Sequence, residues 1–271
     1  MSFLVKKPKR AAVLGCGPTG MFVAHAFAQA GWDVTIYSKK RRSEMFGAQY
    51  LHQPIPGLTE AQGEIRYDLI GGSHQDYRQK VYGDQLEPGQ VSTELFAGLK
   101  HEVWDIRAAY YDAWALYSDR IVNEHITPSW ISDSFVGRSG KNKLWERVVS
   151  TIPAPALCYH KHDFLSRTIW AQGDAPERGI FALRVAPAGH VVCNAAKAPS
   201  WYRASNVFGY NTVEWAGSKP PLDDIAEVQK PVRNNCDCFD DLPGFQRVGR
   251  YGQWRKGVLT HHAYQQIRAS L

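Results

Sequence analysis

The residues with the clearest chemical potential form a glycine-rich run near the start of the chain, Gly15-Cys16-Gly17-Pro18-Thr19-Gly20. The run fits the pattern G-x-G-x-x-G. In this pattern the first glycine allows a tight turn, the second lets the backbone approach a pyrophosphate, and the third lets a helix pack closely on a strand. The helix that follows presents free N–H groups and a partial positive charge to phosphate. The run predicts dinucleotide binding through Gly15, Gly17, Pro18, Thr19 and Gly20.

A second feature lies about twenty residues further on, where such sites usually carry an acidic residue for the ribose hydroxyls. Here that place holds Ser38, followed by Lys39 and Lys40. A missing acid with cations nearby is typical of a 2′-phosphate, and therefore of NADP. The alternative is FAD, with the Ser38 hydroxyl on the ribose. The glycine-rich run alone leaves both cofactors open.

A third feature is the segment Val248–Val258, VGRYGQWRKGV, near the end of the chain. It resembles the C-terminal flavin motif of FAD-dependent oxidoreductases with the glutathione-reductase-type fold, most closely the amine-oxidase and UDP-galactopyranose mutase groups. The resemblance implies FAD, with Arg250 paired to the pyrophosphate as a guanidinium fork suits phosphate oxygens. Without that role, Arg250 would cap a helix or lie in solvent. The further FAD contacts implied are Ser38, Lys39, Gln49, Gly249, Trp254, Gly257 and Val258.

Two other segments are similar to this group. Residues 148–153 resemble the strand on the adenine side, and residues 47–52 lie where related proteins run the chain along the redox end of the flavin. In the second segment, Gln49 and His52 could hydrogen-bond the flavin or the substrate, although His52 could equally be an ordinary loop histidine.

Two more candidates for substrate chemistry lie in a predicted sheet, in the sequence WYRAS. They are Tyr202 and Arg203. Arg203 could anchor an anionic group of the substrate, with an exposed ion pair as the equal alternative. On the last predicted helix, at most one of His261 and His262 can face the cofactor, because neighbouring helical residues point in different directions.

The sequence contains no P-loop, no H-E-x-x-H motif and no Ser-His-Asp arrangement. The five cysteines are an odd number and are scattered, which indicates reduced thiols in a cytoplasmic protein. Cys236 and Cys238 form a C-x-C pair, but no second Cys or His pair lies nearby at metal-binding spacing. We therefore expect no metal site.

The elements that must position these residues follow from apolar patterns and turn signals. Residues 10–37 predict a strand, a helix from 21 to 30 and a parallel strand from 34 to 37. A loop is expected at 39–62. The other expected strands are 64–69, 77–82, 145–152, 180–185, 190–193, 203–214 and 245–248, and the other expected helices are 103–121 and 258–271.

This order predicts an α/β protein with a Rossmann-type FAD-binding domain and a smaller, mainly antiparallel β-sheet substrate lobe that covers the flavin. The discontinuous FAD-binding domain would comprise residues 1–62, 102–155 and 236–271, and the lobe residues 63–101 and 156–235.

Composition and charge limit the classes of partner that this chain could bind. Of the 271 residues, 44% are hydrophobic and 21% charged, as in ordinary globular proteins. No apolar run approaches the roughly 20 residues of a membrane helix, and the N-terminal segment is not a secretory signal. The net charge of +6 favours anionic partners, including nucleic acid as a weaker option. The oligomeric state stays open.

The function predicted is FAD-dependent oxidation or reduction of a small molecule that could be anionic. An oxidase or dehydrogenase is favoured because a second G-x-G-x-x-G for NAD(P)H is absent. Four alternatives stay open: a non-redox flavoenzyme like the sugar mutases, a flavin enzyme acting on nucleic acid, an NADP-binding reductase, and a nucleotide-binding module without catalysis.

Overall fold

The computed structural model describes residues 7–39, 45–47, 50–60, 62–83, 98–136, 144–172, 185–223 and 225–271. The chain divides into two compact units. Unit 1 comprises residues 1–43, 110–164 and 233–271, and unit 2 comprises residues 44–109 and 165–232.

Unit 1 is built on a five-stranded sheet with the order β12-β6-β1-β2-β5, in which every pairing is parallel. Its strands are β1 (Arg10–Leu14), β2 (Asp33–Ser38), β5 (Ile121–Asn123), β6 (Arg147–Ser150) and β12 (Phe245–Arg247). The apolar run of β1 is completely buried from Ala11 to Leu14 because this strand has neighbours on both sides. The predicted parallel strand-helix-strand unit is confirmed.

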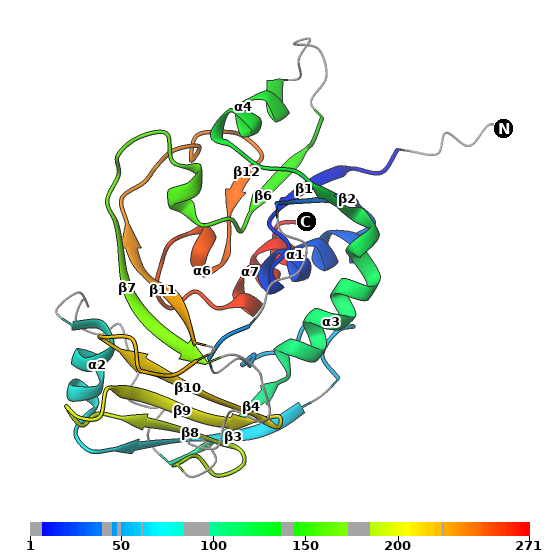
Figure 1. Cartoon of the computed structure of the whole chain (residues 1–271). Helices are drawn as coiled ribbons and strands as arrows, with labels where there is room; N and C mark the ends of the chain where they lie inside the picture. Colours follow the sequence, from blue (N-terminus) through cyan, green and yellow to red (C-terminus); the bar gives the residue numbers. More distant parts are fainter. Residues whose placement is uncertain are drawn as a thin grey trace. The chain divides into compact units, whose positions relative to one another are not determined.

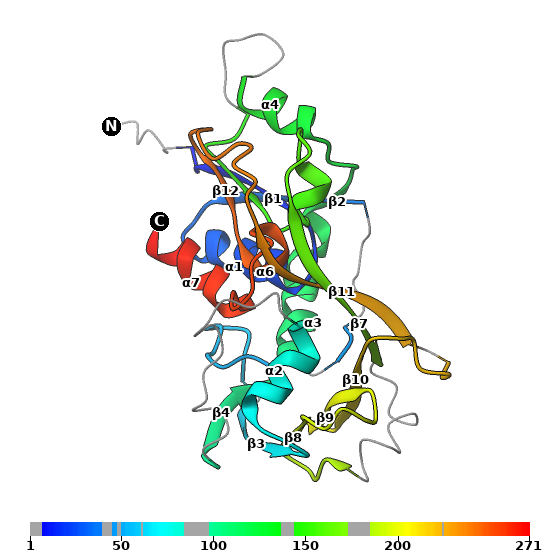
Figure 2. The ribbon, with the colours of Figure 1, turned by 90° about the vertical axis from the view of Figure 1, so that its left-hand side faces the viewer.

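Helices join and cover these strands. They are α1 (Pro18–Gln29), α3 (Ile106–Tyr117), α4 (Pro128–Val136), α6 (Gly249–Gly252) and α7 (Thr260–Ala269), with 3-10 turns at Ser118–Arg120 and Ala154–Leu157. The last helix, α7, lies beside α1 (Figures 1 and 2). The first helix, α1, and the last helix, α7, therefore pack together within unit 1, as the sequence predicts.

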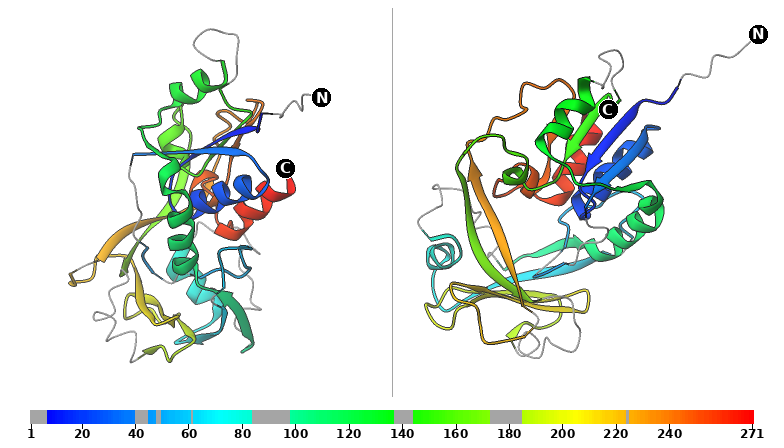
Figure 3. Two further views of the ribbon diagram at one scale, coloured as in Figure 1. Left: turned by 90° about the vertical axis from the view of Figure 1, so that its right-hand side faces the viewer. Right: turned by 45° about the horizontal axis from the view of Figure 1, so that its top comes forward.

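Unit 2 contains a seven-stranded sheet with the order β11-β7-β10-β9-β8-β3-β4. Its strands are β3 (Gln62–Ile70), β4 (Lys100–Trp104), β7 (Phe164–Gln172), β8 (His190–Asn194), β9 (Trp201–Val207), β10 (Tyr210–Ala216) and β11 (Ile225–Asn234). The β3–β8 pairing is parallel, whereas β3–β4, β8–β9, β9–β10 and β7–β10 are antiparallel. The strands β7 and β11 run side by side (Figure 3). The predicted mainly antiparallel lobe is confirmed.

The division between the units differs from the predicted one. Residues 44–62 and 102–109 belong to unit 2, and residues 156–164 belong to unit 1. A bridge between Leu51 and Trp104 ties the first two segments to the sheet of unit 2, while Leu157 packs into the core beside β1 and β6. Local turn signals contain no information about these long-range contacts.

One predicted strand is wrong. Residues 77–82 belong to α2 (His74–Tyr82). Ser73 accepts a hydrogen bond from the backbone N–H of Asp76, and the Asp76 carboxylate accepts one from the backbone N–H of Ser73. This capping box starts a helix where the sequence pattern predicted a strand.

Other boundaries were also missed. The predicted helix from residue 103 begins at Ile106, because β4 occupies Lys100–Trp104. The stretch 203–214 is two strands joined by a tight turn at Phe208 and Gly209, both with positive φ. The strands β5 and β11 and the helix α4 had no prediction. Most of the strand expected at 180–185 lies outside the described residues. No helix in the described part of the chain combines the length and apolarity needed to cross a bilayer.

Candidate functional site

The first candidate site is the turn between β1 and α1 in unit 1. Gly15 has φ +102°, and a Cβ there would lie 2.5 Å from Thr151 Oγ1. A Cβ at Gly20 would lie 1.9 Å from the carbonyl oxygen of Gly15. Both positions therefore require glycine, the first for its backbone conformation and the second for close packing of the helix on the turn.

The N-terminus of α1 has no capping side chain. Its N-cap is Gly17, which makes no side-chain hydrogen bond to the first turn. Pro18 occupies the first position of the helix, and the first turn contains no acidic residue. The N–H groups of a first helical turn have no partner within the helix, so this end suits a pyrophosphate.

The C-terminal turn, α6, lies against this helix end. A Cβ at Gly249 would lie 2.6 Å from Thr19 Cγ2, and a Cβ at Gly252 would lie 2.6 Å from the carbonyl oxygen of Ser150. Thr19 Oγ1 also donates to Thr260 Oγ1 at 3.4 Å. We call the segments Gly15–Gly20 and Gly249–Gly252 together the glycine cradle. The fold thus brings together the two motifs that the sequence assigned to one cofactor.

The predicted cofactor residues near the C-terminal turn take different positions. Arg250 is half-exposed, and its side chain has no hydrogen-bond or ion-pair partner among the described residues. Trp254 is buried at 6% exposure and packs edge-on to Phe164 and Tyr251, with ring centroids 6.0 and 6.2 Å away. Gly257 is exposed with φ +80°, and Val258 is half-buried. Arg250 is therefore the cation of this turn that could reach a phosphate.

At the end of β2, Ser38 is buried and Lys39 is exposed. Gly15 N–H donates to the carbonyl of Tyr37 at 2.8 Å, so this strand end lies beside the glycine turn. A side-chain hydrogen bond joins Ser38 to Cys16. Ser38 thus lies at the strand end beside the glycine turn. Gln49 lies outside the described residues.

The second candidate site is in unit 2, on the sheet face beside α2. Glu214, Arg203, Tyr202 and Lys230 form what we call the carboxylate cluster. Tyr202 OH donates to Glu214 Oε2 at 2.5 Å, and Arg203 Nη2 donates to Glu214 Oε1 at 2.5 Å. Lys230 Nζ donates to Tyr202 OH at 2.7 Å and lies 3.6 Å from Glu214 Oε2.

A β-bulge creates this cluster. Glu214 pairs with Arg203 across the strands, but the next residue, Trp215, pairs with Trp201. Tyr202 therefore has no partner across the strands, and the alternation of faces breaks at this point. As a result, the consecutive residues Tyr202 and Arg203 both reach the same carboxylate.

The charges of the cluster are held in a buried environment. Burial raises the pKa of Glu214, but Arg203 and Lys230 outweigh burial and lower it to about 2. Burial and the Glu214 charge raise the pKa of Tyr202 well above its usual value. At neutral pH the cluster therefore contains one carboxylate, one neutral phenol and two cations.

This arrangement changes the interpretation of the predicted substrate residues. Tyr202 has 0% exposure and is held by Glu214 and Lys230, so the side chain itself does not face a substrate. Arg203 was expected to be a free anchor for an anion, but its charge is balanced by Glu214, and its Nε has no partner among the described residues. His52 is half-buried with its ring edge-on to Tyr50, at a centroid distance of 5.3 Å.

Gly47 lies in a loop against Glu214 of the carboxylate cluster. A Cβ at Gly47, which has φ +73°, would lie 2.1 Å from Glu214 Oε1. Gly47 N–H donates to the carbonyl of Gln172. The backbone of this loop therefore approaches the carboxylate closely, and only glycine permits that approach.

Sequence reasoning missed Glu214 and Lys230. One signal was present: Glu214 stands in the apolar run Val213–Ala216, and a carboxylate is almost never buried unless it is paired. This signal indicates that Glu214 has a partner of opposite charge, but it does not identify the partner. Lys230 comes from β11, which had no prediction.

Comparisons with known proteins find solved structures with a similar fold. No family model and no curated protein matches the chain. Among solved structures, reduced UDP-galactopyranose mutase matches with a TM-score of 0.53 at 11% identity, over 97% of this chain and 94% of that one. The tetrameric form of 2-methyl-3-hydroxypyridine-5-carboxylic acid oxygenase matches with a TM-score of 0.51 at 13% identity, over 97% of this chain and 87% of that one.

The chain therefore shares its overall fold with these two enzymes. UDP-galactopyranose mutase represents one of the two groups that the C-terminal motif resembles, so the predicted likeness is confirmed for the fold. One of these proteins is named as an oxygenase and the other as a mutase. The fold therefore does not select a reaction, and the choice depends on the residues of this chain.

The sequence around Cys236 and Cys238 gave no sign that other potential metal ligands lie close to them. No second Cys or His pair is near these two residues in the sequence, but in the structure Cys158 and His162 lie next to them. The chain returns to this place after unit 2, so sequence distance says nothing about it.

Proposed function

We propose that this chain is an FAD-dependent oxidoreductase that acts on a small anionic molecule. The observation that carries the proposal is the glycine cradle, in which two motifs from opposite ends of the chain meet at an uncapped helix N-terminus. Crowding at Gly15, Gly20, Gly249 and Gly252 leaves no room for side chains around that helix end. Such a cradle suits the pyrophosphate of a dinucleotide.

The roles of the residues follow from this geometry. The N–H groups at the start of α1 would bind the pyrophosphate, with Arg250 as a charge-assisted partner. The Ser38 hydroxyl, at the end of β2, would contact the ribose. When bound, FAD supplies a two-electron acceptor or donor.

The substrate class is inferred from charge. The carboxylate cluster contains two cations against one carboxylate, and the whole chain has a net charge of +6. Excess positive charge in a buried place favours an anionic ligand. We therefore assign the substrate to the face of the unit 2 sheet where Gly47 lies against Glu214.

The direction of electron flow is inferred from what the sequence lacks. It has a single G-x-G-x-x-G and no second one for a pyridine nucleotide. An enzyme that takes hydride from its substrate needs only oxygen or an electron carrier to complete the cycle. This supports an oxidase or a dehydrogenase over a pyridine-nucleotide reductase.

A mutase-like reaction without net redox change is the second candidate, favoured by the likeness to UDP-galactopyranose mutase. Action on nucleic acid is favoured only by the basic balance. An NADP reductase is favoured only by Ser38, Lys39 and Lys40.

The deciding experiment is the visible spectrum of the purified protein, with mass spectrometry of whatever is released on denaturation. We expect a flavin spectrum and stoichiometric FAD. Small carboxylates and phosphates should then be added anaerobically, with matched neutral analogues as controls. We expect an anionic compound to bleach the flavin and its neutral analogue to leave the flavin oxidised. A colourless protein that binds NADPH and ignores FAD would contradict the proposal, and rapid bleaching by NADPH alone would favour a reductase or monooxygenase.

A further inference from the structure

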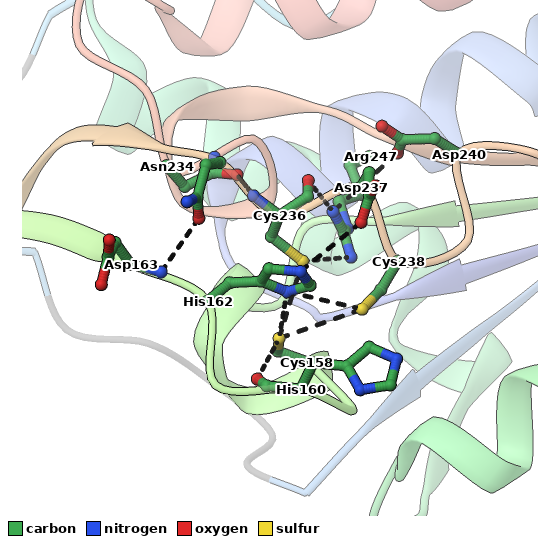
Figure 4. A network of polar contacts seen from close by, with 11 residues as sticks. Cys158, His160, His162, Asp163, Asn234, Cys236, Asp237, Cys238, Asp240 and Arg247 are labelled. Atoms are coloured by element: carbon green, nitrogen blue, oxygen red, sulfur yellow. Dashed lines mark hydrogen bonds and ion pairs between the residues drawn. The ribbon is translucent and has the colours of Figure 1, made fainter.

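Three of the five cysteines converge on one histidine in unit 1. Cys158 and His162 lie in the loop that precedes β7, and Cys236 and Cys238 lie in the loop that follows β11. We call these four residues the cysteine cluster. Figure 4 shows the three sulfur atoms and the His162 ring pointing toward one another. All four potential ligand atoms lie within 4.8 Å of one another.

The spacing of these atoms is that of a tetrahedron around one small ion. Cys158 Sγ lies 3.7 Å from Cys236 Sγ and 4.0 Å from Cys238 Sγ. His162 Nδ1 lies 3.1 Å from Cys158 Sγ and 3.7 Å from Cys238 Sγ. Zinc bonds of about 2.3 Å to sulfur and about 2.0–2.1 Å to nitrogen give tetrahedral edges of about 3.8 Å between sulfurs and about 3.6 Å between sulfur and nitrogen.

Neither a disulfide nor apolar packing accounts for the whole cluster. A disulfide needs an S–S distance of about 2.05 Å, and the pair at 3.7 Å is well beyond that. Cysteine also packs as a small apolar residue, and Cys236 and Cys238 are indeed buried at the edge of the unit 1 core. Apolar packing does not explain why an imidazole nitrogen faces the sulfurs.

The surrounding polar contacts are those that support a metal. Arg247 Nη2 donates to Cys236 Sγ at 3.4 Å, which would offset the single negative charge of three thiolates with one divalent ion. The other ring nitrogen of His162 lies 3.5 Å from the carboxylate of Asp237. A carboxylate behind a ligating histidine fixes the ring and its tautomer. Asn234 Oδ1 accepts from the Cys236 N–H at 2.7 Å and holds the loop.

We propose that Cys158, His162, Cys236 and Cys238 bind a single zinc ion with a structural role. A Cys₃His set supplies all four ligands, so no position remains for a substrate. Soft thiolates with one imidazole select zinc over hard cations, and a polynuclear iron–sulfur cluster would need ligands further apart, on different metals.

The position of the cysteine cluster in the fold explains its proposed structural role. The chain leaves unit 1 after residue 164 and returns at residue 233. The ligands lie just before the exit and just after the return, where β7 and β11 are neighbours. One ion would link the two loops and so hold together the start and the end of the segment 165–232, which belongs to unit 2. This role is independent of flavin binding.

The test begins with the full chain, expressed in zinc-supplemented medium and purified under reducing conditions. Elemental analysis should find one zinc per chain. Cys236→Ser and His162→Ala should lose the zinc, while the control His160→Ala should keep it. His160 is exposed and lies two residues away, beside the cluster in Figure 4. Wild-type protein without zinc, or zinc retained in Cys236→Ser, would overturn the proposal.

Two measurements on wild-type protein keep the proposal testable if the variants fail to fold. X-ray absorption at the zinc edge should show three sulfur ligands and one nitrogen ligand. Alkylation followed by mass spectrometry should modify Cys158, Cys236 and Cys238 only after a chelator is added. Oxygen ligands, another metal, or a disulfide that reductant reverses would contradict the assignment. These readouts do not involve flavin. A protein that binds zinc but no flavin would therefore refute the proposed function and leave the zinc proposal intact.

Discussion

The glycine cradle of unit 1 and the carboxylate cluster of unit 2 are opposite ways to build a polar site. The cradle is made by the backbone, and its crowded positions are glycines, which have no Cβ: Gly15, Gly20, Gly249 and Gly252. The cluster is made by long charged side chains that satisfy one another inside a sheet. The first depends on empty space and the second on charge balance. Added atoms should therefore damage the cradle, and removed charges should damage the cluster.

The largest effect is expected from an added side chain in the cradle. In Gly20→Val, the Cβ would overlap the Gly15 carbonyl oxygen, from which it would be 1.9 Å away. The turn between β1 and α1 cannot relax without moving α1, so FAD binding should be lost. Flavin absorbance and circular dichroism of the purified variant measure this.

The matched control is Gly31→Asn at the other end of α1. Gly31 has φ +76° with nothing within 4 Å of an added Cβ, and asparagine tolerates this conformation better than other residues. The control should retain FAD. Full flavin occupancy in Gly20→Val would mean that the cradle is not crowded.

The next effect is expected from a lost charge in the cluster. Glu214→Gln keeps the shape but leaves Arg203 and Lys230 without their carboxylate. Removing one partner from a buried pair typically costs about 3–5 kcal/mol. Denaturant unfolding should show this loss, whereas Glu227→Gln on the exposed part of β11 should change stability by less than about 0.5 kcal/mol. Equal stability of the two variants would show that the cluster is not energetically coupled.

The pH dependence of stability sharpens the same contrast. The pKa of Glu214 is about 2 in the folded chain and 4.5 as a free group. A depressed pKa contributes stability that is present above pH 4.5 and lost as pH falls toward 2. This contribution amounts to about 3 kcal/mol. The difference in unfolding free energy between wild type and Glu214→Gln should shrink across that window. A constant difference would be evidence against the ion pair.

A smaller effect is expected at the rim of the cradle. Arg250→Ala removes a charge-assisted contact of about 1.5–3 kcal/mol, so FAD affinity should fall by roughly one to two orders of magnitude while the fold survives. Arg255→Ala, an exposed arginine five positions later, is the control and should bind FAD normally. If both variants bind FAD equally well, Arg250 does not contact the pyrophosphate.

The smallest effect is expected at Lys39. The sequence counted this residue among the FAD contacts, but it is exposed beyond the end of β2, and FAD has no 2′-phosphate for its cation to pair with. Lys39→Ala should change FAD affinity by less than about twofold, as expected for a solvated lysine. Titration with both FAD and NADPH measures this. A selective loss of NADPH binding would instead support the NADP interpretation.

The sequence by itself determined the cradle. Its chemistry resides in two short contiguous segments, because a turn, a helix start and the need for glycine are local properties of the backbone. The capping box at Ser73 and Asp76 was equally local and could have been recognised, since it predicts α2 directly. Local signals therefore predicted the glycine turn at Gly15–Gly20 and the C-terminal turn that contains Arg250, and they could have corrected the strand expected at 77–82.

Only the tertiary structure decided the other two sites. The carboxylate cluster needs a bulge at Tyr202 and strand β11 to supply Lys230. The cysteine cluster needs the chain to return to unit 1 at residue 233, which places Cys236 and Cys238 beside Cys158 and His162. Strand pairing and register depend on contacts across tens of residues, and no local pattern encodes which distant side chains will face one another.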